Sequence, residues 1–216
     1  LFGGGASSFA RGLIPGLGAG WAVAHATIKA REMIATENAL GALTGSQTAG
    51  RREMDYLRTF SDTYGLRMSE SAAGFKRILA SSAGTKLEGA GAKAIFEGTS
   101  LYGKTLGLSN ENMSRATTAI SQMISKGKIS SEELKGQLAE AIPGAVQIFA
   151  DAMKVPVSQM FKMMENGEVL AEDVLPKVAV LLKQAAESGG ALERAMKSSA
   201  SAQNRFMNAW EGFLKS

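Results

Sequence analysis

Adjacent carboxylates occur at two points of the chain, Glu132 with Glu133 and Glu172 with Asp173. Paired carboxylates could serve as a general acid and base, or could bind a hard cation. Each pair precedes a Leu or Val at the start of a predicted helix, where attraction to the positive end of the helix dipole already explains it. With 1 His and no Cys, the sequence has neither a nucleophile with its base nor a set of metal ligands. We therefore expect no enzyme activity, no catalytic residue, no cofactor and no metal site.

Residues 98–105, GTSLYGKT, match the pattern of a phosphate-binding loop, with Gly98, Gly103, Lys104 and Thr105 at its fixed positions. Such a loop needs a buried strand before it and a helix after it, so that its backbone amides face the phosphates. The preceding residues KAIFE could form a strand only if residues 90–96 are not helical, and no second strand with a terminal Asp follows. We expect Lys104 and Thr105 on a helix surface, and nucleotide binding is a less favoured alternative.

Two segments 40 residues apart, 123–138 and 163–178, share the same order of residue types. Each has an apolar helix face, a glycine that can end the helix in the left-handed conformation, one apolar residue, and carboxylates that open the next helix. Ser130 and Glu133 also have the spacing of a capping box. We interpret the recurrence as a duplicated helix hairpin in which the apolar residue is buried. Its structural residues are Gly127, Ile129, Gly167 and Val169, and Pro143 is expected to break the chain between the copies.

The composition predicts an all-α protein. The chain has 216 residues, of which 45% are hydrophobic, enough for one or two packed helical units. Its 25 Gly and 4 Pro suggest many short helices with glycine ends, and strand-like alternation is nearly absent. Predicted helices include residues 51–64, 69–83 and 86–106. We expect a bundle of short helices with helix-hairpin repeats, leading into a long C-terminal helix like that of a coiled coil.

The formal net charge of +4 is unevenly distributed, and the pI is about 9.3. Residues 126–176 carry 5 Lys and Arg against 8 Asp and Glu, whereas residues 177–216 carry 6 against 3. Basic side chains can neutralise phosphates, but the sequence has no dense basic run. We therefore expect no specific nucleic-acid partner.

Residues 12–28 contain no formal charge if His25 is neutral. This stretch is near the lower length limit for spanning a bilayer, and its glycines and Pro15 weaken the first half as a helix. A packed or fusogenic amphipathic helix is favoured over a permanent transmembrane span. A membrane-inserting helical pore or fusion protein is therefore the main alternative function. The candidate membrane-active residues are Gly12, Gly16, Gly20, Trp21 and Val23.

A series of short motifs follows in order between residues 126 and 177. They are Lys126-Gly127, Glu132-Glu133-Leu134, Gln137-Leu138, Glu140-Ala141-Ile142-Pro143-Gly144, Ala152-Met153-Lys154-Val155, Asn166-Gly167-Glu168-Val169 and Leu175-Pro176-Lys177. In this order they resemble the tape-measure domain of the tail length-determining proteins of long-tailed bacteriophages and prophages. The wider resemblance extends from about residue 30 to residue 187. Lys154 departs from the pattern, because a glycine is common at that position in the family.

The resemblance implies a structural virion protein whose full chain runs inside the tail tube, sets tail length during assembly and leaves with the DNA during ejection. It also implies the tail-tube protein, tail assembly chaperones and tail-tip or baseplate proteins as partners, together with the host membrane on ejection. We therefore expect the protein in the virion tail, and in the host cytoplasm during assembly. Because the chain opens with Leu1 and not Met, it is expected to be a piece of a longer polypeptide.

The pattern of residues 188–216 predicts an amphipathic helix that is the start of a rod. Leu192, Ser199, Phe206 and Phe213 recur at seven-residue spacing, with alanines three residues after the first three. The candidate seam of a homo-oligomer, expected to be a trimer, is Leu192, Phe206, Trp210 and Phe213, with Glu211 on the outer face. The alternative is a terminal helix that folds back on the same domain. The expected divisions are a Gly- and Ala-rich apolar segment, 1–50, the helical tape-measure domain, 51–187, and the start of the rod, 188–216.

Overall fold

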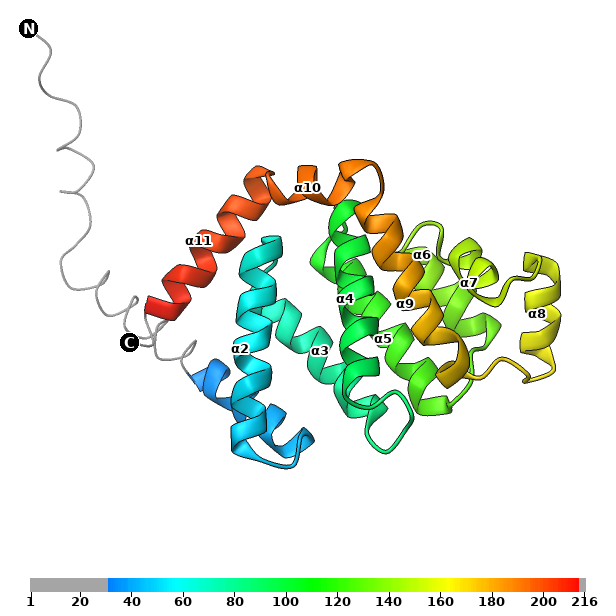
Figure 1. Ribbon diagram of the computed structural model, residues 1–216, viewed down its shortest axis with the longest axis horizontal. Coiled ribbons are helices and arrows are strands. Elements are labelled where there is room, and N and C mark those ends of the chain that lie inside the picture. Colours follow the sequence, from blue (N-terminus) through cyan, green and yellow to red (C-terminus); the bar gives the residue numbers. More distant parts are fainter. Residues whose placement is uncertain (1–30, 214–216) are drawn as a thin grey trace, which may run out of the picture.

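The computed structural model describes residues 31–213, which form a bundle of helices (Figure 1). Residues 31–43 are helical and precede α2 (Gln47–Tyr64), α3 (Met68–Ser82), α4 (Ala90–Thr105) and α5 (Asn110–Lys126). Next come a π-helix, η2 (Glu132–Leu138), and the helices α6 (Ala139–Ala141), α7 (Ala145–Met153), α8 (Val157–Glu165) and α9 (Ala171–Glu187). The last described elements are a 3-10 turn, η3 (Ser188–Gly190), α10 (Ala191–Met196) and α11 (Ser199–Phe213). No strand occurs within residues 31–213, and the predicted all-α class is confirmed.

The helices α4 and α9 lie side by side in the middle of the bundle (Figure 1). Gly98 allows this approach, because a Cβ at this position would stand 2.4 Å from the carbonyl oxygen of Ala179 in α9. All of residues 98–105 belong to α4. Their backbone amides are therefore used in helical hydrogen bonds and cannot surround a phosphate. The phosphate-loop alternative is wrong, and its first glycine serves helix packing.

A cluster of aromatic rings joins α2, α3 and α4 in the core. The ring centroids of Phe75 and Phe96 are 5.2 Å apart and those of Phe60 and Phe96 are 5.3 Å apart, in the tilted geometries that aromatic pairs prefer. Tyr56 extends the cluster outward, and its hydroxyl donates a hydrogen bond of 2.9 Å to Glu97. Burial, and then the Glu97 carboxylate, raise the pKa of Tyr56 far above its usual value. Tyr56 is therefore a permanent hydrogen-bond donor between α2 and α4.

The two segments that repeat at a 40-residue spacing, 123–138 and 163–178, contact each other through their loops. Gly127 ends α5 with φ 70° and Gly167 follows α8 with φ 73°, so both glycines take the left-handed conformation. The backbone amide of Ile129 donates to the carbonyl of Val169 at 2.8 Å, and the amide of Ala171 donates to the carbonyl of Gly127 at 3.0 Å. Ile129 and Val169 are each 1% exposed. Each loop therefore closes the other through its backbone, with both apolar side chains in the core.

The helices that follow these two loops differ. α9 begins as an α-helix with Glu172 and Asp173 in its first turn, whereas the first copy continues as the π-helix η2. Glu133 of η2 is 1% exposed and accepts hydrogen bonds from Ser130 and Lys126. Burial raises the pKa of Glu133, but these hydrogen bonds and one from its own backbone amide outweigh burial and hold the pKa below its usual value. Glu133 is therefore a buried, ionised carboxylate.

Two tight turns flank α7. Pro143 and Gly144, which has φ 83°, separate α7 from α6, and the carbonyl of Pro143 accepts a hydrogen bond from Tyr102 at 3.4 Å. At the other end, Lys154 has φ 57° and is the only non-glycine residue with a positive φ among those described. A lysine therefore occupies the left-handed conformation that favours glycine.

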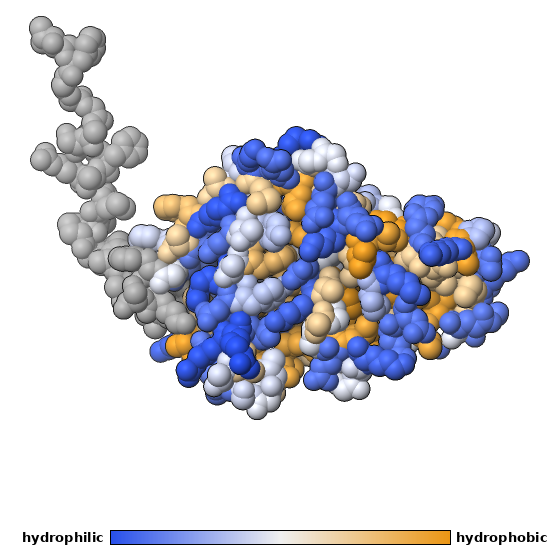
Figure 2. Space-filling model, in the orientation of Figure 1, coloured by the Kyte–Doolittle hydropathy of each residue, from blue (hydrophilic) through white to orange (hydrophobic). Residues whose placement is uncertain are grey.

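None of the described helices is both long and apolar enough to cross a membrane. The predicted membrane-active segment, with Gly12, Gly16, Gly20, Trp21 and Val23, lies outside the described residues. On the face shown in Figure 2, apolar residues form small areas separated by hydrophilic ones.

The single long C-terminal helix expected from the sequence is not confirmed. α10 ends at Met196, and Lys197 and Ser198 separate it from α11. Leu192 of α10 is 7% exposed, and α10 packs against α4 and α9. α11 then runs back along α2 (Figure 1). Within the described residues, the chain folds back on its own domain, as in the alternative interpretation of the sequence.

Candidate functional site

The candidate site is the surface of α11, whose two sides have opposite character. A turn of about 100° per residue places Phe206 and Trp210 on one side of the helix and Asn204 and Asn208 on the other. Phe206 is 67% exposed and Trp210 is 48% exposed. The polar side contacts the rest of the domain. This arrangement is the reverse of an ordinary surface helix, in which the apolar side faces the core.

The four residues of the predicted seam do not share one surface. Leu192 is buried under α10, whereas Phe206 and Trp210 lie on the outward side of α11. Phe213 is the last residue of α11, and its side chain lies outside what the structure describes. The expectation that Glu211 lies on the outer face is wrong, because its carboxylate is 11% exposed and pairs with Arg67 at 2.7 Å.

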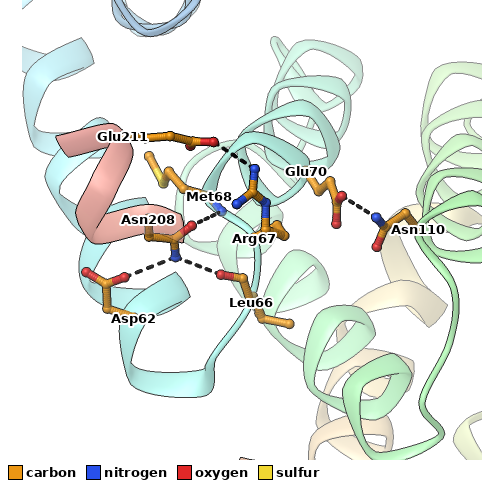
Figure 3. A network of polar contacts seen from close by, with 8 residues as sticks. All are labelled: Asp62, Leu66, Arg67, Met68, Glu70, Asn110, Asn208 and Glu211. Carbon is orange, nitrogen blue, oxygen red and sulfur yellow. Dashed lines mark hydrogen bonds and ion pairs between the residues drawn. The ribbon is translucent and has the colours of Figure 1, made fainter. Parts of the chain in front are cut away.

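Asn208 connects α11 to the α2–α3 corner, which we define as residues 62–68 (Figure 3). Its side-chain oxygen accepts a hydrogen bond from the amide of Met68 at 3.1 Å, and its side-chain nitrogen donates to the carbonyl of Leu66 at 2.8 Å. The same nitrogen donates to the carboxylate of Asp62 at 3.1 Å. Met68 is the first residue of α3, and Arg67 before it makes no side-chain capping bond. Asn208 therefore supplies the cap that α3 lacks locally.

Other residues of α11 donate hydrogen bonds to the backbone carbonyls on the other side of the corner, at the C-terminal end of α2. Arg205 donates to the carbonyls of Asp62 and Thr63 at 2.8 and 3.0 Å, and Asn204 donates to the carbonyl of Gly65 at 3.0 Å. Lys104 of α4 donates to the same carbonyl of Gly65 at 3.0 Å. The last carbonyls of a helix lack helical partners and form the negative end of its dipole, so these donors stabilise α2.

Two further polar pairs surround the corner (Figure 3). The ion pair between Arg67 and Glu211 joins α11 to the start of α3, with the Arg67 side chain 19% exposed. Glu70, one turn further along α3, accepts a hydrogen bond from Asn110 at the start of α5. Burial raises the pKa of Glu70, and the charge of Arg67 partly opposes this rise. These pairs tie α11, α3 and α5 together at one end of the bundle.

A cleft of about 620 Å³ lies between this corner and α10. Its walls come from α3, α4 and α5, and its small residues include Ser71, Gly74 and Gly103. Its charged lining includes Lys104, whose pKa is lowered by burial and by the charge of Arg205. No group of His, Cys, Asp or Glu within residues 31–213 is arranged to hold a metal ion. Side chains of the last elements that line the cleft are Ala195, Ser198, Ala200 and Asn204.

The polar side of α11 was not found by sequence reasoning, which singled out the apolar side. Asn204, Arg205, Asn208 and Glu211 follow one another at helical spacing on the side that contacts the corner. One signal was available, because two Asn residues four positions apart are unusual inside a helix. The partners of these side chains lie about 140 residues earlier in the chain, where no local pattern identifies them.

These contacts cap helices, close loops and fill a core, so the fold and the site define a structural helical domain. The sequence profile of the family described as "Tape measure protein" matches residues 25–216, and the chain belongs to this family. It is similar to the "Probable tape measure protein" of Salmonella phage Felix O1 (isolate Felix O1-VT1), with 33% identity over 124 residues. The match covers 57% of this chain and 17% of that relative. No solved structure matches the chain.

Proposed function

We propose that the chain is a domain of a phage tail tape-measure protein that sets tail length during assembly, occupies the lumen of the tail tube and leaves with the genome during ejection. The match of the family profile over residues 25–216 carries this proposal. The similarity to a probable tape measure protein of a phage supports it. In this role the protein is a structural component and not an enzyme. It resides in the host cytoplasm during assembly and then in the virion tail.

The packed domain and the length-setting part are separate in this proposal. A helical rod adds about 1.5 Å of length per residue, whereas helices that fold back on one another do not add length in this way. The described helices pack into one bundle (Figure 1). The similarity covers only 17% of the phage relative, which leaves most of a protein of that size for a rod. We assign tail length to such a rod, outside residues 31–213.

Tail lengths of phages with altered tape-measure genes test this assignment. An in-frame deletion of about 100 residues from the helical rod of the full-length protein should shorten the tail by about 150 Å. A short flexible insertion at the exposed turn of Ala83 and Gly84 serves as the control and should leave tail length unchanged. Electron microscopy of assembled tails measures both. Tails of normal length after the rod deletion would contradict the proposed function.

The outward side of α11 supports self-association, which we propose to be a homo-trimer inside the tail tube. Phe206 and Trp210 form a narrow exposed stripe of the width that another helix covers. Phe206→Glu and Trp210→Glu should shift the 216-residue chain toward monomer in sedimentation equilibrium. Gly212→Glu adds the same charge to α11 away from the stripe and should have little effect. A parent chain that is monomeric at about 50 μM would contradict the trimer.

The remaining partners follow from the proposed place in the tail. They are the tail-tube protein around the rod, the tail assembly chaperones, and the tail-tip or baseplate proteins at one end. The three divisions expected from the sequence, 1–50, 51–187 and 188–216, remain the proposed organisation, except that α10 and α11 of the last division pack on the domain and the rod lies beyond them. The family profile already begins at residue 25.

The uncharged segment 12–28 supports a further proposal, contact with the host membrane on ejection. The chain should float with liposomes, and Val23→Asp should reduce the floating fraction because a charged side chain is costly in the bilayer. Equal flotation of both chains would contradict a role for this segment.

A further inference from the structure

No apolar side chain of α11 is part of the described core. Among the α11 residues whose side chains are described, only Ser201 is buried, with 0% exposure. In contrast, α10 contributes the buried Leu192 to the contact with α4 and α9. Burial of apolar surface is the main favourable term that holds helices on a domain. Among the described side chains of α11, none therefore contributes the fully buried apolar surface that attaches the other long helices.

The contacts that replace apolar burial are polar, and most of them are made to the α2–α3 corner. Arg205 and Ser201 also donate to the carbonyls of Met196 and Ala195 at the end of α10, at 3.1 and 2.6 Å. Asn204, Arg205 and Asn208 bond to backbone groups of the α2–α3 corner, and Glu211 pairs with Arg67 at the end of the same corner. Water can replace each of these partners when the helix leaves, so each hydrogen bond contributes only a modest net stabilisation. Because those made to the corner share one short segment, they are expected to break together.

The chain has two places at which it can bend before α11. Gly189 and Gly190 have φ of 59° and 68°, between α9 and α10. Lys197 and Ser198 then interrupt the helix between α10 and α11. The second of these is next to α11, so α11 can move while Leu192 keeps α10 in place.

We propose that α11 is a releasable strap, a helix that caps the α2–α3 corner in the docked state and detaches as a unit while α2–α9 stay folded. Release removes the cap of α3 and the donors at the end of α2, and it opens the side of the 620 Å³ cleft that Ala200 and Asn204 line. Release lets α11 change direction relative to the domain while α2–α9 stay folded. This property does not depend on the proposed function.

Thiol labelling of the 216-residue chain tests the strap, since the sequence contains no cysteine. Ser201→Cys places a thiol where α11 meets the corner, because a Cβ at Gly65 would stand 2.5 Å from the Ser201 Cβ. Thr99→Cys is the control in the middle of α4. Both native side chains are 0% exposed, and each hydroxyl donates to a nearby backbone carbonyl. Labelling with Ellman's reagent measures how often each site opens.

We expect the Ser201→Cys thiol to react at least about 30-fold faster than the Thr99→Cys thiol, with a weaker dependence on urea, because local opening exposes little surface. Adding Asn208→Ala should speed labelling of Ser201→Cys by about tenfold and leave Thr99→Cys nearly unchanged. Gln203→Ala, at an exposed position of α11, should change neither rate by more than about twofold. Equal rates and equal urea dependence for both thiols would overturn the proposal.

Amide hydrogen exchange of the unmodified chain gives an independent result, since Ser201→Cys removes the hydrogen bond to the carbonyl of Ala195. Segments of α11 should exchange well before those of α4, through an opening that also releases the amide of Met68 in the corner. If the amides of α11 exchange as slowly as those of α4, α11 opens only when α2–α9 unfold. It is then not a strap, whatever the labelling rates.

Discussion

Replacing Gly98 with alanine should force α4 and α9 apart. The added Cβ would stand 2.4 Å from the carbonyl oxygen of Ala179, whereas Cβ contacts shorter than 3.0 Å essentially never occur. The helices must therefore separate by at least about 0.6 Å, and a gap of 0.5 to 1 Å loses roughly a quarter to a half of each dispersion contact. Overpacking of this kind costs about 1–3 kcal/mol, and here the obstacle is main chain, which cannot rotate away. The gain in helix propensity of about 1 kcal/mol offsets only part of it.

Two other glycines of α4 provide matched controls. A Cβ at Gly91 would have its nearest neighbour at 3.6 Å, an ordinary contact, so Gly91→Ala should be neutral or stabilising by a few tenths of a kcal/mol, up to about 1. A Cβ at Gly103 would stand 2.0 Å from the terminal methyl of Met113, which can rotate away. The expected order of stability is therefore Gly91→Ala, the parent, Gly103→Ala and last Gly98→Ala.

Thermal and urea unfolding followed by circular dichroism measures this order. A net loss of about 1 kcal/mol for Gly98→Ala corresponds to a Tm lower by about 2–4 °C in a domain of this size. If Gly98→Ala melts with Gly91→Ala, the close approach of α4 and α9 does not depend on the missing side chain. The packing explanation for the glycine of GTSLYGKT would then be refuted.

Three further predictions concern the loops and turns. Ile129→Asp or Val169→Asp places a charge at a site with 1% exposure, at a cost of several kcal/mol, so both should melt far earlier; unchanged midpoints would show that these side chains are exposed. Lys154→Gly should raise the free energy of unfolding in urea by about 0.5–1 kcal/mol, because glycine adopts φ 57° without strain. The gain is limited because glycine also gives the unfolded chain more conformational freedom. A lower free energy of unfolding would show that the Lys154 side chain makes a contact that the fold needs. The pKa of Glu133 is lower in the folded state, so its stabilisation is present above the unfolded value of about 4.3 and is lost as pH falls below it. Glu133→Gln should therefore flatten the acid side of the stability curve below about pH 4.3, and equal slopes for the two chains would contradict an ionised, paired Glu133.

Helix positions and loop ends could be predicted because their causes are local. Ser109 precedes α5, and its side chain accepts a hydrogen bond from the amide of Asn112, as serine commonly does at the start of a helix. Gly127 and Gly167 end helices because a left-handed residue is needed there and glycine adopts that conformation freely. The recurrence also indicated that Ile129 and Val169 are alike, and the structure places both in the core beside one another. Such features depend on neighbours within a few residues.

The π-helix η2 could not be predicted in this way. The sequence indicates a helix opened by Glu132 and Glu133, but π-helices are rare and occur mostly as single turns within α-helices, so this pattern favours an α-helix. The buried position of Glu133 and its bonds from Lys126 and Ser130 show how tightly η2 is held against the end of α5. These contacts depend on the loop around Gly127, so no periodicity within residues 132–138 reveals them.

The C-terminal helix shows why a correct pattern gave an incomplete prediction. The seven-residue spacing of Leu192, Phe206 and Phe213 is present in the sequence, but Lys197 and Ser198 interrupt the helix, so residues on either side no longer share one face. Counting the spacing of apolar residues gives no weight to the polar ones. In α11 the polar Asn208 determines which side of the helix faces the domain, because it caps α3 and bonds to the carbonyl of Leu66 after α2. A helix cap stabilises a protein by about 1 kcal/mol, and the capping group can come from a distant segment of the chain. The apolar side of α11 is consequently turned outward, where Phe206 is 67% exposed and Trp210 is 48% exposed.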